Sequence, residues 1–323
     1  MNSSLNIFCI TPIKHIEGVQ GLLGSIGNLT IIDDPTIKIF KQNISQMNVI
    51  FTNPNKSKIF LGKENLHDAK NLQVICTAST GTNHIDKAYC KEMGIKIISL
   101  TKELEVISTI SSTAEHALAL LLSAVRNIKF SSISVDEGQW NYEPFVGRQL
   151  NYLTIGIIGY GRLGKMMAKF CKALFKEVLV FDPYVCVTDK GVEQVHSLDD
   201  IARNSDVVSL HVHVSHETQN LISKEFLQEA KPNLLIVNTS RGEIVDEEEM
   251  VKYLKANPKS KIATDVLKNE ITSRNESKLL ILSKESNQVL ITPHIGGMTS
   301  DAQEIAYNHA LQMLIEYIDK KKN

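Results

Sequence analysis

The chain has 323 residues, of which 43% are hydrophobic and 22% are charged, and its formal net charge at pH 7 is −1. These proportions exclude an intrinsically disordered chain, and the near-neutral charge argues against nucleic acid or an anionic membrane as the partner. A chain of this length usually divides into two domains.

Short apolar runs alternate with helix-length segments over the first hundred residues. The runs predict strands at LNIFCI, LTIID, NVIFT, LQVICTA and IKIIS, and residues 65–70 and 86–93 are expected to be helical. This alternation predicts βαβ units, that is, a parallel sheet covered by helices on both faces.

A long helix is predicted over residues 113–136, with Ser112 or Thr113 as its N-cap and Glu115 in its first turn. Its apolar part, HALALLLSAV, falls short of the roughly 18 residues that a membrane span needs, so no membrane segment is expected. A connector, EGQWNYEPFVGRQL, follows the helix, and we interpret its Trp140 as a structural anchor.

Strands resume at LTIGIIGYG, VLVFD, DVVSLHV, NLLIVNT, KIATDV and VLITPH. Residues 104–296 are therefore expected to form a second α/β unit. A last helix, from Thr299 to about Lys320, comes too late for that unit and is expected to pack on the first.

The cysteines and the N-terminus indicate a cytoplasmic protein. Five cysteines at wide spacing, without a CxxC pair, favour reduced thiols over a disulfide framework. The opening residues, MNSSLNIFCITPIK, have no basic region before a long apolar run, so no signal peptide is expected.

A GxGxxG sequence follows the first strand of the second unit and opens an amphipathic helix. Gly159 is expected to permit the tight turn, Gly161 to let the backbone approach a pyrophosphate, and Gly164 to let the helix lie close to the strand. The N–H groups at the start of the helix would then bind the pyrophosphate. Asp182 ends the next strand, 23 residues after Gly159, at a position suited to a ribose hydroxyl.

Asp182 also predicts NAD rather than NADP as the cofactor. A carboxylate would repel the 2′-phosphate of NADP, and the next residues, Pro183 and Tyr184, supply no compensating cation.

Further candidates stand where later strands end, in NTSRGEIVD, TDVLKNE and TPHIGGMTSD. Because the carboxyl ends of parallel strands border the ligand crevice, Arg241, Asp265, Glu270 and His294 are expected near the nicotinamide. They would supply an anion clamp, two acids and a titratable base.

With these motifs the chain resembles the D-isomer-specific 2-hydroxyacid dehydrogenases over nearly its whole length. The resemblance rests on STGTNHID, TAEHALALLL, EGQW, GYGRLG, SLHVHVSHETQNLI, VNTSRGEIVD, TDVLKNE and TPHIGG. It implies an α/β fold with two Rossmann- or flavodoxin-like domains, a 2-hydroxy or 2-oxo acid as the substrate, and a homodimer formed through the cofactor domains. The NAD-binding domain, residues 104–296, would be inserted within a substrate domain made of residues 1–103 and 297–323.

The resemblance also assigns roles to individual residues. Arg241 would bind the substrate's carboxylate and carbonyl, His294 would be the acid and base, and Glu270 would hold His294. Thr80 and Gly81 would form a second carboxylate clamp through their N–H groups. Asp265 would position the nicotinamide carboxamide, and the cofactor would be bound by Gly159, Gly161, Arg162, Leu163, Gly164, Asp182, Thr239, Ser240, Asp265, Gly296 and Gly297.

This sequence departs from the family at several positions. The family commonly has Pro after its acid, where Ile271 follows Glu270, and has Pro where His213 stands. The loop FTNPNKSK contains Asn53 and Lys56 but no Arg, so a phosphorylated substrate is less supported, although Lys56 could act as a point charge.

The stretch HVHVSHET offers a different interpretation, a metal site built on three histidines. The hypothesis fails at Ser215, where the similar run of metallohydrolases carries an acid, and no further ligands are evident. Residues 206–213 instead predict a strand with His211 and His213 on one face. We therefore expect no metal, and we expect His213 to border the adenosine half of NAD.

Two functions remain open. An NAD-dependent oxidoreductase is the first, and an NAD(H)-sensing binding protein like the family's transcriptional corepressors is the second. No long disordered tail for partner docking is evident, which favours the enzyme.

Overall fold

A computed structural model describes residues 5–54 and 59–322, and the chain divides into two units. Unit 1 comprises Met1–Ile110 with Met298–Asn323, and unit 2 comprises Ser111–Gly297. The predicted first boundary, between residues 103 and 104, is therefore seven residues early. Helix α5 (Leu104–Ser108) belongs to unit 1 because its Ile107 is buried in the hydrophobic core of that unit.

Unit 1 is built on a parallel sheet of strand order β2-β1-β3-β4-β5, as in flavodoxin-like folds. The strands are β1 (Leu5–Cys9), β2 (Gly27–Ile31), β3 (Val49–Thr52), β4 (Val74–Thr77) and β5 (Lys96–Ser99). Besides α5, the helices are α1 (Val19–Ile26), α2 (Ile37–Ile44), α3 (Lys63–Leu66), α4 (Lys87–Glu92), α13 (Ser300–Lys322) and the short 3-10 helix η1 (Leu100–Lys102).

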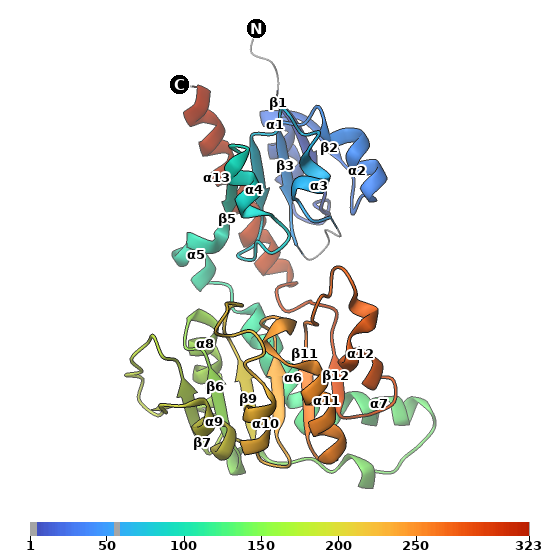
Figure 1. Ribbon diagram of the computed structural model, residues 1–323, viewed down its shortest axis with the longest axis vertical. Coiled ribbons are helices and arrows are strands. Elements are labelled where there is room, and N and C mark those ends of the chain that lie inside the picture. The colour runs from blue at the N-terminus through green and yellow to red at the C-terminus, as the bar shows by residue number, and fades with distance from the viewer. Residues whose placement is uncertain (1–4, 55–58, 323) are drawn as a thin grey trace. The chain divides into compact units, whose positions relative to one another are not determined.

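Helices cover both faces of this sheet. Ile7 and Cys9 of β1 pack with α1, α5 and α13, whereas Phe8 of the same strand packs with α2, α3 and α4. The strands are buried on both sides, which is why they were recognisable as continuous apolar runs. The predicted return of the C-terminal helix to the first unit is confirmed, with Tyr307 and Leu314 buried against α1 and the strands (Figure 1).

Unit 2 is a Rossmann-like unit with a parallel sheet of order β12-β11-β10-β9-β6-β7-β8. The strands are β6 (Thr154–Ile158), β7 (Glu177–Phe181), β8 (Glu193–Gln194), β9 (Val207–Leu210), β10 (Leu235–Asn238), β11 (Lys261–Thr264) and β12 (Val289–Ile291). The helices are α6 (Ser112–Val125), α7 (Ile128–Asp136), α8 (Arg162–Cys171), α9 (Leu198–Asn204), α10 (Lys224–Glu229), α11 (Glu247–Ala256) and α12 (Lys278–Leu282). Short 3-10 helices are η2 (Glu143–Phe145), η3 (Leu150–Tyr152), η4 (Gly242–Ile244) and η5 (Arg274–Glu276).

The two faces of the unit 2 sheet have separate cores. Helices α6 and α8 cover one face, and α9 to α12 cover the other. With two all-parallel sheets and helices on both faces of each, the predicted α/β fold class is confirmed.

The single helix predicted over residues 113–136 is wrong, because the chain forms α6 and α7 with a break between them. Asn127 lies in the left-handed region at φ 57°, which ends α6. The ammonium of Lys261 donates to the carbonyl of Ala124 at 2.8 Å and to the side chain of Asn127. A cation at the carboxyl end of a helix stabilises that end. At the other end the N-cap is Ser111 rather than Ser112 or Thr113.

One helical stretch in the described part of the chain, Leu104–Val125, is long and apolar enough to cross a membrane, contrary to the sequence-based expectation. It is not one continuous helix, since α5 and α6 are separate. Ala117, Leu120 and Leu121 of α6 are buried in the core of unit 2, so a core role explains the composition of that helix.

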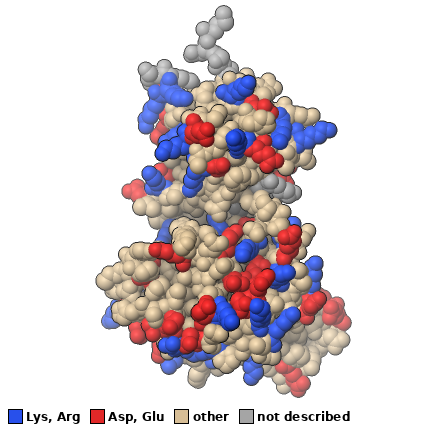
Figure 2. Space-filling view, viewed as in Figure 1, with Lys and Arg blue, Asp and Glu red and all other residues tan. Residues whose placement is uncertain are grey.

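Trp140 does not anchor the connector, because its side chain is 91% exposed. Helix α7, just before it, has no buried residue. Elsewhere, acidic and basic side chains are interspersed on the face shown in Figure 2, in keeping with the net charge of −1.

Candidate functional site

The glycine-rich turn after β6 is packed too closely for side chains at two of its positions. Gly159 has φ +92°, and a Cβ on it would lie 2.5 Å from the carbonyl oxygen of His211. A Cβ on Gly164 would lie 2.0 Å from the oxygen of Gly159. At Gly161, the N-cap of α8, a Cβ would meet no heavy atom within 4 Å, so this N-terminus has open space for a ligand.

Asp182 lies beside this turn, directly after β7. Its carboxylate accepts hydrogen bonds from the N–H of Tyr160 at 2.7 Å and of Tyr184 at 2.9 Å. The predicted proximity of the acid to the glycine-rich turn is thus observed. Since each carboxylate oxygen accepts more than one hydrogen bond, Asp182 retains capacity for ribose hydroxyls.

The turn stands where the sheet order reverses, between β6 and β9. In parallel sheets, ligands bind outside the carboxyl ends of the strands at this switch point. Arg162 and Leu163 begin α8 there, and Arg162 is half-buried, which lowers its pKa. Thr239, after β10, has a buried hydroxyl with no hydrogen-bond partner among the described residues. An open helix N-terminus and an unsatisfied hydroxyl at one sheet edge fit a bound dinucleotide.

The three histidines of HVHVSHET do not converge. Strand β9 ends at Leu210, earlier than predicted, because the chain then turns under the glycine-rich loop. The ring of His211 meets the hydroxyl of Ser209 at 2.9 Å, and burial lowers its pKa to about 4, whereas His213 and His216 are exposed. Within residues 5–54 and 59–322, no three His, Cys, Asp or Glu residues are placed to hold a metal.

Arg241 follows β10 and is held by its own loop. Its Nη1 donates to the carbonyl of Ser240 at 2.6 Å, and its own carbonyl accepts from Asn238 at 2.8 Å. The hydroxyl of Ser240 donates to the carbonyl of Leu210 at 2.7 Å, which ties this loop to the end of β9. A guanidinium has five N–H donors, so the remaining donors are available to a bound anion.

Glu270 and His294 are in direct contact. Oε1 of Glu270 lies 2.5 Å from Nδ1 of His294, and each side chain is about one-quarter to one-third exposed (26% and 29%). The other carboxylate oxygen accepts from the N–H of Leu267 at 3.2 Å. With Nδ1 engaged by the carboxylate, Nε2 is the ring nitrogen positioned for proton transfer. The predicted pairing of these residues is therefore observed.

Asp265 is buried at the end of β11 and binds the turn that follows β12. Its carboxylate accepts from the hydroxyl of Thr292 at 2.5 Å and from the N–H groups of Ile295 at 2.9 Å and Gly296 at 2.7 Å. Asp265 thus organises protein structure as well as being a candidate for cofactor contact. A Cβ on Gly297, the last residue of unit 2, would meet no heavy atom within 4 Å, so the backbone there is open to a ligand.

Sequence reasoning missed Glu247, which holds the loop that carries Glu270. Its buried carboxylate accepts from the N–H groups of Lys268 at 3.2 Å and Lys278 at 2.8 Å, and from the hydroxyl of Ser277 at 2.8 Å. One side chain thus joins both ends of the loop, which has Ile271 instead of the family's Pro. The signal available in the sequence was an acid at the start of a helix, which usually indicates only a favourable dipole interaction.

The loop with Thr80 and Gly81 belongs to unit 1. Their carbonyls accept hydrogen bonds from Thr101 at 2.8 Å and Ser79 at 2.6 Å. Their N–H groups donate to no other described residue, which keeps them available to an anion. Asn53 is buried and donates to the carbonyl of Ala78, and Lys56 lies outside the described residues.

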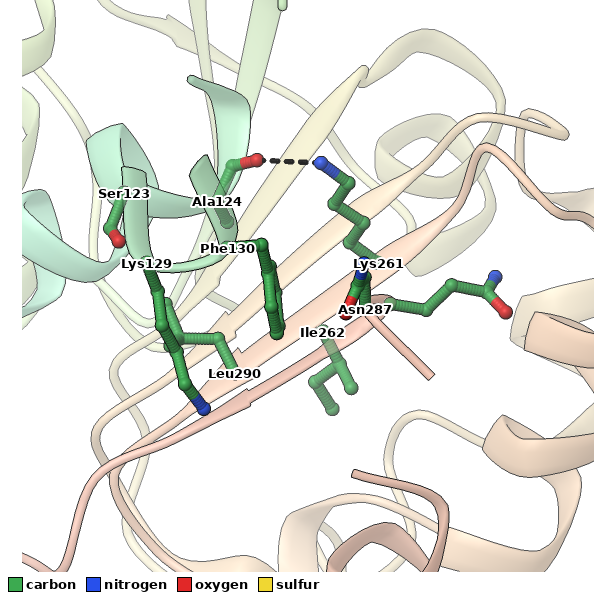
Figure 3. A pocket seen from close by; sticks show the side chains of 9 residues that line it. Ser123, Ala124, Lys129, Phe130, Lys261, Ile262, Asn287 and Leu290 are labelled. Carbon is green, nitrogen blue, oxygen red and sulfur yellow. Dashed lines mark hydrogen bonds between the residues drawn. The ribbon is translucent and has the colours of Figure 1, made fainter. Parts of the chain in front are cut away.

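A second hollow in unit 2 is no substrate site. It measures only about 10 Å³ and is lined by Ala124, Phe130 and Lys261 among others (Figure 3). Lys261 begins β11, so the hollow lies at the amino ends of the strands, away from Arg241 and His294.

Comparison with known proteins decides the family. Residues 118–296 match the D-isomer specific 2-hydroxyacid dehydrogenase, NAD binding domain. The chain belongs to this family. D-3-phosphoglycerate dehydrogenase of Archaeoglobus fulgidus is 37% identical over 251 residues, which are 77% of this chain and 46% of that protein. Hydroxypyruvate reductase of Thermotoga maritima is 34% identical over 72% of this chain and 74% of its own length.

Among solved structures, D-lactate dehydrogenase from Aquifex aeolicus, complexed with NAD and lactic acid, superimposes with a TM-score of 0.83. It is 27% identical, and the match covers 98% of this chain and 96% of that one. The chain spans about half the length of the phosphoglycerate dehydrogenases that it matches. It contains the NAD-binding domain of the D-2-hydroxyacid dehydrogenases, and the glycine-rich turn, Asp182 and Thr239 all lie within the matched residues.

The contacts of Glu247 lead to a stability prediction. Glu247→Ala should lower the free energy of unfolding by about 3 kcal/mol, because two N–H groups and a hydroxyl lose their buried acceptor. Urea denaturation measures the change. The neighbouring Glu248 is exposed, so Glu248→Ala is the matched control and should change stability by less than about 0.5 kcal/mol. Equal losses in both variants would contradict the role given to Glu247.

Proposed function

We propose that the protein is an NAD-dependent oxidoreductase that interconverts a small 2-oxo acid and the corresponding D-2-hydroxy acid. The observation that carries the proposal is the 2.5 Å contact between Glu270 and His294, at the same sheet edge as Arg241 and the glycine-rich turn. A dyad of this kind supplies a proton at a defined atom, which reduction of a carbonyl requires.

The proposed mechanism gives each residue one task. Arg241 binds the carboxylate and the carbonyl oxygen of the substrate through its free N–H donors. Bound NADH supplies the hydride that adds to the carbonyl carbon. The imidazolium of His294 donates the proton from Nε2 to the carbonyl oxygen, and the carboxylate of Glu270 stabilises the charged ring through Nδ1. In the oxidative direction neutral His294 accepts the hydroxyl proton at Nε2.

Relatives and residues leave different scope for the substrate. The relatives include a phosphoglycerate dehydrogenase, a hydroxypyruvate reductase and a D-lactate dehydrogenase. The described part of the loop after β3 contains no Arg that could bind a phosphate, and Asn53 there is occupied with Ala78. We therefore propose an unphosphorylated acid of small size.

The enzyme is tested by the loss of NADH absorbance with a panel of small 2-oxo acids. His294→Ala should lower kcat by about 10²- to 10⁴-fold, because it removes the proton donor, and should leave NADH affinity within about threefold. The exposed His196 provides the control His196→Ala, which should keep full turnover. Tight NADH binding without turnover of any acid would instead support the alternative, an NAD(H)-sensing binding protein.

We also propose a homodimer formed through the cofactor domains. Support comes from exposed apolar side chains on and after α7, which include Ile133 (42%), Val135 (49%), Trp140 (91%) and Tyr142 (78%). A contiguous apolar surface of this kind is typical of a protein interface, and Trp and Tyr are frequent anchors there.

Sedimentation tests the homodimer. The wild-type protein should sediment as a dimer at micromolar concentration, and Trp140→Glu should weaken association at least tenfold because it places a charge in the apolar interface. Leu104 of unit 1 is 71% exposed, so Leu104→Glu is the control and should remain dimeric. A monomeric wild type, or a Trp140→Glu protein that stays dimeric, would contradict the proposal.

A further inference from the structure

His116, a residue of α6 that the mechanism does not use, contacts the group that holds the catalytic turn. Its Nε2 lies 2.9 Å from the hydroxyl oxygen of Thr292 and 3.3 Å from Oδ1 of Asp265. The hydroxyl of Thr292 is itself 2.5 Å from the same Oδ1. The three side chains form a closed triangle in unit 2, with Asp265 only 2% exposed.

The chemistry of the three groups fixes the direction of their hydrogen bonds. A carboxylate only accepts, so the hydroxyl of Thr292 donates its single proton to Asp265. The hydroxyl oxygen can then only accept from Nε2 of His116, which must carry a hydrogen. Burial alone would raise the pKa of Asp265, but the hydrogen bonds from His116, Thr292 and two backbone N–H groups outweigh it and lower that pKa.

Asp265 in turn holds three successive N–H groups. The N–H of His294 donates to its main-chain carbonyl at 2.9 Å, and those of Ile295 and Gly296 donate to its carboxylate. His294 needs this support, because its φ of +56° is the left-handed conformation, which costs a non-glycine residue about 1 kcal/mol or more. Any displacement of Asp265 therefore moves the backbone that carries His294.

We propose that His116 is a positioning residue for His294, acting through Thr292 and Asp265 and without contact to substrate. The inference rests on the proposed function insofar as His294 is the proton donor. It also assigns a purpose to the helix that opens unit 2. Through His116, α6 fixes the turn with which the same unit ends, so the two ends of the unit 2 chain are joined by one network.

Kinetics of two His116 variants test the proposal. Gln places an amide N–H donor close to the position of Nε2, whereas Leu fills similar space without a donor. His116→Leu should lower kcat about 10- to 100-fold, with KM and NADH affinity changed by less than about threefold, because the reacting atoms are misplaced rather than the ligands lost. His116→Gln should recover most of kcat. Thr292→Val, which also breaks the triangle, should reproduce the Leu phenotype if His116→Leu fails to fold.

A second measurement separates this inference from the proposed enzyme. The imidazole resonances of His294 in the protein without ligands, followed by NMR, should shift in His116→Leu and stay at the wild-type positions in His116→Gln. If no 2-oxo acid turns over but this pattern is found, the proposed function fails and the positioning role stands. Unchanged His294 resonances in His116→Leu, or a Gln variant as impaired as Leu, would overturn the positioning role.

Discussion

The carboxylate of Asp265 collects the hydroxyl of Thr292 and the N–H groups of Ile295 and Gly296, and its carbonyl takes the N–H of His294. These hydrogen bonds keep His294 in a left-handed backbone conformation that its side chain disfavours. The ring is consequently directed so that Glu270 meets Nδ1. Without this anchor the dyad would have neither a fixed position nor a defined proton-bearing nitrogen.

The same logic, in which buried carboxylates organise loops, applies elsewhere in unit 2. Glu247 joins the two ends of the loop with Glu270, and Asp182 binds the N–H of Tyr160 in the glycine-rich turn. Each carboxylate holds a loop at the carboxyl edge of the sheet, where the strands themselves can no longer hold the backbone. Buried charges of this kind are retained only when their hydrogen bonds are satisfied, which makes each loop position specific.

Much of this arrangement could be predicted from the sequence because it follows from local patterns. Strands buried on both faces are visible as apolar runs, and Gly159 and Asp182 mark the nucleotide-binding edge by spacing alone. Local patterns failed where tertiary contacts decide. Helix α6 ends at Asn127 because Lys261, far along the chain, binds its last turn, and β9 ends at Leu210 because His211 packs under the glycine-rich turn. His116 could not be linked to Thr292, since the two are 176 residues apart.

The central claim is that a hydride and a proton reach opposite ends of one carbonyl bond at this edge of unit 2. The most direct test uses NADH that carries deuterium at its transferable position, with the 2-oxo acid that reacts fastest. The account predicts a product with one deuterium on C2 and the D configuration at that carbon. Deuterium lost to solvent, or a product of L configuration, would contradict it.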